Sequence, residues 1–159
     1  MTPRQQTYKH DPENGVFGDC ARTCLAALLE VPNEQVPHFL WDNPSGEVFN
    51  KRLDVWLTNY GLARFVVTFP KEVELEALMA YMRHMNPDVY VCLVGQSKLG
   101  CNHIVITLNG EIVMDPSGNG IVGPCDDGFW YVETYMPLGF TVRKNSVEDK
   151  EWLDQQFKF

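Results

Sequence analysis

The dipeptide Asn109-Gly110, which separates two apolar runs, constrains the fold more than any other feature of this 159-residue chain. Asn and Gly both adopt positive φ readily, so the pair predicts a tight turn between antiparallel strands at 103–108 and 111–114. Asp115-Pro116-Ser117-Gly118 follows at once and is typical of a β-turn. We therefore expect an antiparallel sheet in the second half of the chain.

Apolar residues recur at helical spacing in the first half, and the pattern changes to short apolar runs in the second. The predicted helices are 20–30, 47–60 and 72–84, with a final helix within 146–159. The other predicted strands are 62–69, 89–94, 129–134 and 140–142. Helices followed by antiparallel strands indicate an α+β fold, and the length suits a single domain over residues 1–159.

Composition excludes several classes of protein. The net charge of -8 disfavours binding to phosphate backbones, so we expect no nucleic-acid partner. The polar start of the chain lacks the apolar core of a secretory signal, and no apolar run reaches the length of a membrane span. We therefore expect a cytoplasmic protein without a membrane partner. The five cysteines are an odd number, and in a reducing compartment we expect free thiols.

Cys20 is the candidate nucleophile because it begins the first predicted helix, directly after Asp19. The partial positive charge of a helix N-terminus favours a thiolate. Asp19 is a good N-cap residue, but its carboxylate opposes the thiolate, so activation requires a histidine. The alternative is that Cys20 is a small buried residue without chemistry.

His103 opens one strand of the predicted hairpin, and Asp115 ends the other. A general base needs a rigid platform, and an aspartate can fix its tautomer. In an unbulged two-residue hairpin these side chains would point to opposite faces. A three-residue loop, or an equivalent bulge in a strand, would place them together. The catalytic hypothesis therefore predicts a bulge; the alternative is a strand-end histidine and a turn aspartate.

Acyl transfer by a thiol also needs a donor that stabilises the oxyanion. The candidates are the backbone N–H of Cys20 and the side-chain amide of Asn14, six residues upstream. Gln5 and Gln6 carry longer amides but lie further away in the sequence.

A zinc site from Cys20, Cys24, Cys101 and His103 is the competing use of these side chains. The compact Cys-x-x-Cys pairs of structural zinc sites are absent from the sequence, so we expect neither a metal nor another cofactor. Cys101 is a second candidate thiol close to His103. His10 and His38 both stand near proline or aromatic residues, and for His38, in Val36-Pro37-His38-Phe39, this favours a structural role over a catalytic one.

Two stretches carry a resemblance to a known family. GDCARTCLAALLEVPNEQVPHF, residues 18–39, and HIVITLNGEIVMDPSG, residues 103–118, resemble the nucleophile helix and the histidine hairpin of the papain-like cysteine peptidase superfamily. Within it, the chain is most similar to bacteriocin-leader-type peptidases and to small phage and bacterial proteins of similar layout. The resemblance implies a papain-like fold with Cys20 as nucleophile, His103 as base and Asp115 as orienting residue. Asn14 has the spacing of the family's oxyanion glutamine, and Ala21 replaces the glycine that typically follows the nucleophile.

The expected function is hydrolysis of an amide, isopeptide or thioester bond in a peptide or protein substrate by a Cys-His-Asp triad. A peptidase or amidase fits, as does a deamidase or an acyl transferase. The alternative is a catalytically inactive papain-like module that binds a partner protein in a phage or mobile element.

Overall fold

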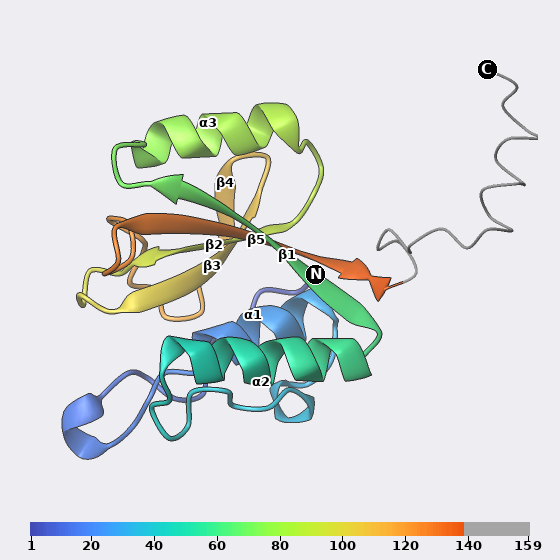
Figure 1. Cartoon of the computed structure of the whole chain (residues 1–159), viewed down its shortest axis with the longest axis vertical. Helices are drawn as coiled ribbons and strands as arrows, with labels where there is room; N and C mark the ends of the chain where they lie inside the picture. Colours follow the sequence, from blue (N-terminus) through green and yellow to red (C-terminus); the bar gives the residue numbers. More distant parts are fainter. Residues whose placement is uncertain (139–159) are drawn as a thin grey trace, which may run out of the picture.

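The computed structural model describes residues 1–138 and consists of one antiparallel sheet with helices on both faces (Figure 1). The five strands lie in the order β1-β5-β2-β3-β4. Their bounds are Leu62–Pro70 for β1, Val91–Gln96 for β2, Asn102–Leu108 for β3, Glu111–Met114 for β4 and Phe129–Pro137 for β5. All of these pairings are antiparallel, so the α+β class predicted from the sequence is confirmed.

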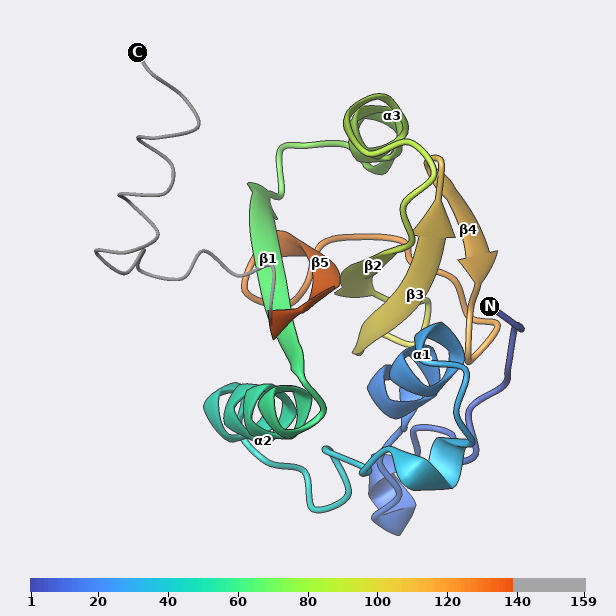
Figure 2. The ribbon, with the colours of Figure 1, turned by 90° about the vertical axis from the view of Figure 1, so that its right-hand side faces the viewer.

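Three α-helices cover the sheet, with α3 on one face and α1 and α2 on the other (Figure 2). Their bounds are Cys20–Leu28 for α1, Gly46–Asn59 for α2 and Leu75–Met85 for α3. Two short 3-10 helices, Pro12–Asn14 and Asn33–Gln35, precede and follow α1. The expected strand 140–142 and the expected helix within 146–159 lie outside the described residues. No helix in residues 1–138 is both long and apolar enough to cross a membrane.

Apolar side chains form one core on each face of the sheet and a third between α1 and α2. On the α1 face Cys24, Cys92 and Ile106 are fully buried, whereas Leu78 and Leu93 are fully buried on the α3 face. Successive strand residues point alternately to these two cores, as expected for a sheet that is covered on both faces.

The hairpin of β3 and β4 contains the bulge that the catalytic hypothesis predicts. Thr107 pairs with Ile112, but Ile106 pairs with Met114, so Val113 is an extra residue in β4. The turn itself is the two-residue form, with Asn109 and Gly110 both at positive φ. The bulge therefore lies in β4. Because of the extra residue, the side chains that follow it, including that of Asp115, point to the opposite face from the one that an unbulged strand would give.

The lead-in segment before α1 connects the start of that helix to the turn after β4. Tyr8 donates its backbone N–H to Asp19 Oδ1 over 2.9 Å, and the Asp19 N–H is bonded to the Tyr8 carbonyl. Further along, the Gln6 N–H is bonded to the Pro116 carbonyl over 3.0 Å. Asp19 occupies the N-cap position, but its side chain makes no capping bond because it holds Tyr8 instead.

Arg64 on β1 ties α2 to the sheet through a buried polar network. It lies 2.9 Å from Glu133 Oε1 on β5 and also binds Asp54 and Asn50 on α2. The side chains of Arg64 and Glu133 are only 9% and 8% exposed. Tyr135 donates its hydroxyl to the second Glu133 oxygen, so both oxygens of this buried carboxylate have a partner.

Candidate functional site

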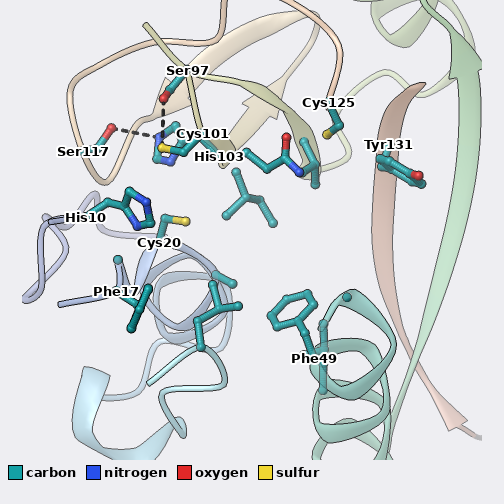
Figure 3. Close-up of a pocket in the computed structure, with 18 of the residues that line it drawn as sticks. His10, Phe17, Cys20, Phe49, Ser97, Cys101, His103, Ser117, Cys125 and Tyr131 are labelled. Carbon is teal, nitrogen blue, oxygen red and sulfur yellow. Dashed lines mark hydrogen bonds between the residues drawn. The ribbon is translucent and has the colours of Figure 1, made fainter. Parts of the chain in front are cut away.

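A cavity of about 800 Å³ lies between the sheet, α1 and α2, and two of the three predicted triad residues line it, whereas Asp115 does not. Cys20 and His103 line it on one side, and Tyr131 and Phe49 lie across from them (Figure 3). Its apolar wall includes Phe17, Leu53, Val66 and Val94. A largely apolar cavity with a few convergent polar groups is the usual form of a small-molecule or peptide site.

Cys20 is the first residue of α1 and its side chain is almost completely buried. Burial raises the pKa of this thiol to about 11, with smaller contributions from Cys101 and Asp19 in the same direction. The backbone N–H groups of Ile104 and Ala21 act against this increase but do not cancel it. The resting residue is therefore a neutral thiol at pH 7, and it needs a base in order to act as a nucleophile.

His103 and Asp115 form the pair that the sequence analysis proposed. His103 Nε2 lies 2.8 Å from Asp115 Oδ1. Partial burial alone would raise the pKa of Asp115, but the bond from His103 and the N–H groups of Gly120, Ser117 and Gly118 lower it to about 2. Asp115 is therefore an ionised acceptor at neutral pH, held at the end of β4 by its own turn.

The state of Asp115 determines the tautomer of His103. An ionised carboxylate only accepts hydrogen bonds, so it favours the tautomer of a neutral His103 ring that carries the proton on Nε2. Within residues 1–138, Nδ1 makes no hydrogen bond although the residue is only 4% exposed, and His103 lines the cavity. The free lone pair of Nδ1 is what a general base requires.

Cys20 and His103 share this cavity but do not form a hydrogen bond with each other in the part of the chain that the structure describes. The thiol sulfur instead meets the backbone N–H of Ile104, the residue that follows His103. In Figure 3, Cys20 and the His103 ring lie on the same side of the cavity.

The structure does not bring Asn14 to the nucleophile. Asn14 is exposed, donates its side-chain N–H to Asp11 over 2.7 Å and does not line the cavity. Gln6 does line it, and its Oε1 is buried without a hydrogen-bond partner. Its Nε2 lies beside Gly18, two residues before Cys20, at 3.6 Å from where a Cβ would stand. Of the three amides considered from the sequence, Gln6 is therefore the one at this site, whereas Gln5 is exposed and does not line the cavity.

Two further side chains reach the site without having been singled out as functional from the sequence. Ser117 Oγ lies 3.0 Å from His103 Nε2, and His10 lines the cavity beside Cys20 (Figure 3). The His10 ring also lies 6.1 Å from that of Phe17, as its aromatic neighbourhood in the sequence indicated. The Asp-Pro-Ser-Gly turn could have indicated Ser117, whereas nothing local in the sequence marks His10.

The four side chains considered for zinc serve separate purposes. Cys24 is fully buried in the core and donates its thiol to the Ile104 carbonyl, and Cys101 interacts with Ser97 over 3.4 Å. No group of three or more His, Cys, Asp or Glu residues within 1–138 is arranged to hold a metal ion. All five cysteines are free thiols.

Comparison with family models, curated proteins and solved structures finds no match to this chain.

Proposed function

We propose that the protein is a papain-like thiol hydrolase that cleaves an amide, isopeptide or thioester bond through Cys20, His103 and Asp115. The observation that supports this most strongly is the 2.8 Å bond between His103 and Asp115 beside a cavity that also contains Cys20. It leaves Nδ1 of the ring as a base and fixes its orientation.

The raised pKa of Cys20 favours a concerted first step over a preformed ion pair. His103 Nδ1 takes the thiol proton as the sulfur attacks the carbonyl carbon, and Asp115 stabilises the resulting imidazolium. The Gln6 amide and the Cys20 N–H stabilise the oxyanion. The imidazolium then protonates the leaving group, and water releases the acyl group from the sulfur. An amine in place of water would give an acyl transferase, and a side-chain amide as substrate would give a deamidase.

A peptide or protein segment is the substrate class that we propose. The cavity combines an apolar wall with a thiol at one side, which suits an acyl group carrying an apolar side chain. The free cysteines fit action in a reducing compartment such as the cytoplasm.

Covalent trapping tests the proposal. The full chain is incubated with a peptidyl thioester, and the acylated cysteine is mapped by mass spectrometry in the wild type, Cys20→Ser and Cys101→Ser. We expect acylation at Cys20 that persists in Cys101→Ser and disappears in Cys20→Ser. Acylation spread over several cysteines, or equal in all three proteins, would contradict it.

One observation favours a second candidate, an inactive papain-like module that binds a partner protein. Cys20 is a neutral, buried thiol and is not hydrogen-bonded to His103 in residues 1–138. For such a module the thioester would acylate Cys20 no faster than it acylates a small free thiol. The trapping experiment therefore separates the two candidates.

A further inference from the structure

The Ser117 hydroxyl touches both His103 and Asp115, and no step proposed above uses it. Ser117 Oγ lies 3.0 Å from His103 Nε2 and 3.1 Å from Asp115 Oδ1. We propose that Ser117 is a positioning residue that keeps the proton of His103 on Nε2 and so keeps Nδ1 free to accept a proton. The inference rests on the proposed function for its catalytic meaning, but the tautomer itself is measured independently of activity.

The partners of Ser117 Oγ determine where its single proton points. The backbone N–H of Asn119 donates to this oxygen over 3.0 Å. The carboxylate of Asp115 can only accept, because it is ionised at neutral pH. The hydroxyl proton therefore points to Asp115 Oδ1, and a lone pair of Oγ remains for the N–H at His103 Nε2. The Nε2 proton is thus shared between two acceptors, Asp115 Oδ1 and Ser117 Oγ.

The turn holds this hydroxyl in place before any substrate binds. Asp115 Oδ1 accepts the N–H groups of Ser117 and Gly118 over 3.0 Å each, and Oδ2 accepts that of Gly120 over 2.7 Å. Gly118 and Gly120 have φ values of 74° and 70°, in the region that favours glycine. The sequence after Asp115 is therefore suited to close the backbone around the carboxylate and to aim the serine at the imidazole.

Removing the hydroxyl changes the balance between the two tautomers of His103. Without Oγ, the proton on Nε2 loses one of its two acceptors, and Asp115 loses one donor. The tautomer with the proton on Nδ1 then gains population, and in that form Nδ1 cannot take a proton from Cys20. The loss of one hydrogen bond of this kind corresponds to a shift of about fivefold in the tautomer ratio.

The test is ¹⁵N NMR of the histidine ring nitrogens in the full chain at pH 7.5, with and without the serine hydroxyl. The variants are Ser117→Ala, Ser117→Thr, which restores a hydroxyl, and Ser97→Ala. Ser97 is the matched control because its hydroxyl lines the same cavity but binds Cys101 and not His103. His103→Ala assigns the signals.

We expect the Nε2–H tautomer of His103 in the wild type, in Ser117→Thr and in Ser97→Ala. In Ser117→Ala we expect the ratio of the Nε2–H to the Nδ1–H tautomer to fall about fivefold, and the Cys20 acylation rate to fall with the remaining Nε2–H fraction, by less than that factor. An unchanged Nε2–H signature in a folded Ser117→Ala protein would overturn the inference. If Cys20 is not acylated in any protein but the tautomer shifts as expected, the proposed function fails and the positioning role stands.

Discussion

Burial raises the pKa of both acidic residues of the site, but only at Asp115 do hydrogen bonds outweigh it. It raises the pKa of Cys20 to about 11, whereas hydrogen bonds hold that of Asp115 at about 2 despite partial burial. The carboxylate is therefore permanently charged and the thiol permanently protonated near neutral pH. In the proposed mechanism the free Nδ1 of His103 accepts the proton of the Cys20 thiol, so the activation of Cys20 depends on His103.

The identity of the oxyanion donor is a prediction at the scale of single residues. We expect Gln6→Ala to lower the rate of Cys20 acylation by about 10² to 10³, because a buried oxyanion donor contributes about that much. Asn14→Ala is the matched control, since Asn14 is exposed and binds Asp11 instead. Stopped-flow acylation with a thioester measures both. Equal rates in the wild type and Gln6→Ala would contradict Gln6 as the oxyanion donor. A large loss in Asn14→Ala would point to Asn14 as the donor instead.

Among the elements, the β3–β4 hairpin does most to assemble the site. Its turn and its bulge were predicted from Asn109-Gly110 and from the requirement that His103 meet Asp115. Only the catalytic hypothesis required the bulge, because the sequence alone is equally compatible with an unbulged hairpin. Its position in β4 follows from packing, since Met114 is buried against α1.

The hairpin turn also packs against α3, which gives a prediction about Gly110. This residue has a φ of 71°, and a Cβ here would overlap the Met79 carbonyl oxygen of α3. We expect Gly110→Ala to destabilise the fold by about 2 to 4 kcal/mol, because the clash adds to the cost of positive φ. Gly61→Ala is the control, since Gly61 has a φ of 78° but open space around it. Its expected cost is about 1 kcal/mol. Equal costs in urea denaturation would mean that α3 moves freely to accept the methyl group.

Helix α2 is held to the sheet by Arg64, and this predicts an unequal effect of two arginine substitutions. Arg64→Ala leaves Glu133 buried without its cation, so we expect a loss of about 3 kcal/mol. Arg52→Ala removes the more exposed pair with Asp42 and a bond to the Phe39 carbonyl, and it should cost clearly less than Arg64→Ala. Denaturant unfolding of both variants measures the difference. Similar losses would show that the Arg64 network contributes no more than a surface pair.

At the scale of the whole molecule, the sequence predicted the elements far better than their arrangement. Helices α1 to α3 and strands β1 to β5 lie within a few residues of the predicted ranges, because each carries its own hydrophobic period. The strand order could not be predicted, since β1 pairs with β5, a strand far away in the sequence with three other strands between them. For the same reason Gln6 was not preferred over Asn14. The backbone N–H of Gln6 is bonded to the Pro116 carbonyl, and this bond holds Gln6 near the site. The irregular sequence of the lead-in segment does not predict that contact.

The stability of the whole molecule in acid follows from Asp115. Its folded pKa of about 2 lies below the ordinary value of 3.8, so its contribution is fully present above about pH 4. That contribution is lost as the pH falls through 2. With allowance for partial exposure, it amounts to about 1 to 2 kcal/mol. We expect the unfolding free energy of Asp115→Asn to lack this part of the decrease between pH 4 and pH 2. Parallel pH profiles for the two proteins would show that the bonds to Asp115 do not stabilise its charged form.

The central claim is that His103 activates a neutral Cys20, and the rate of Cys20 acylation in wild type and His103→Ala tests it most directly. The measurement uses a peptidyl thioester at pH 7.5, with a small free thiol as reference. A thiol with a pKa of about 11 has almost no thiolate at this pH, so reactivity above the reference must come from the base. We predict that wild-type Cys20 reacts faster than the reference and that His103→Ala lowers the rate by about 10² to 10⁴. A wild-type rate no higher than the reference, or an unchanged rate in a folded His103→Ala protein, would contradict the account.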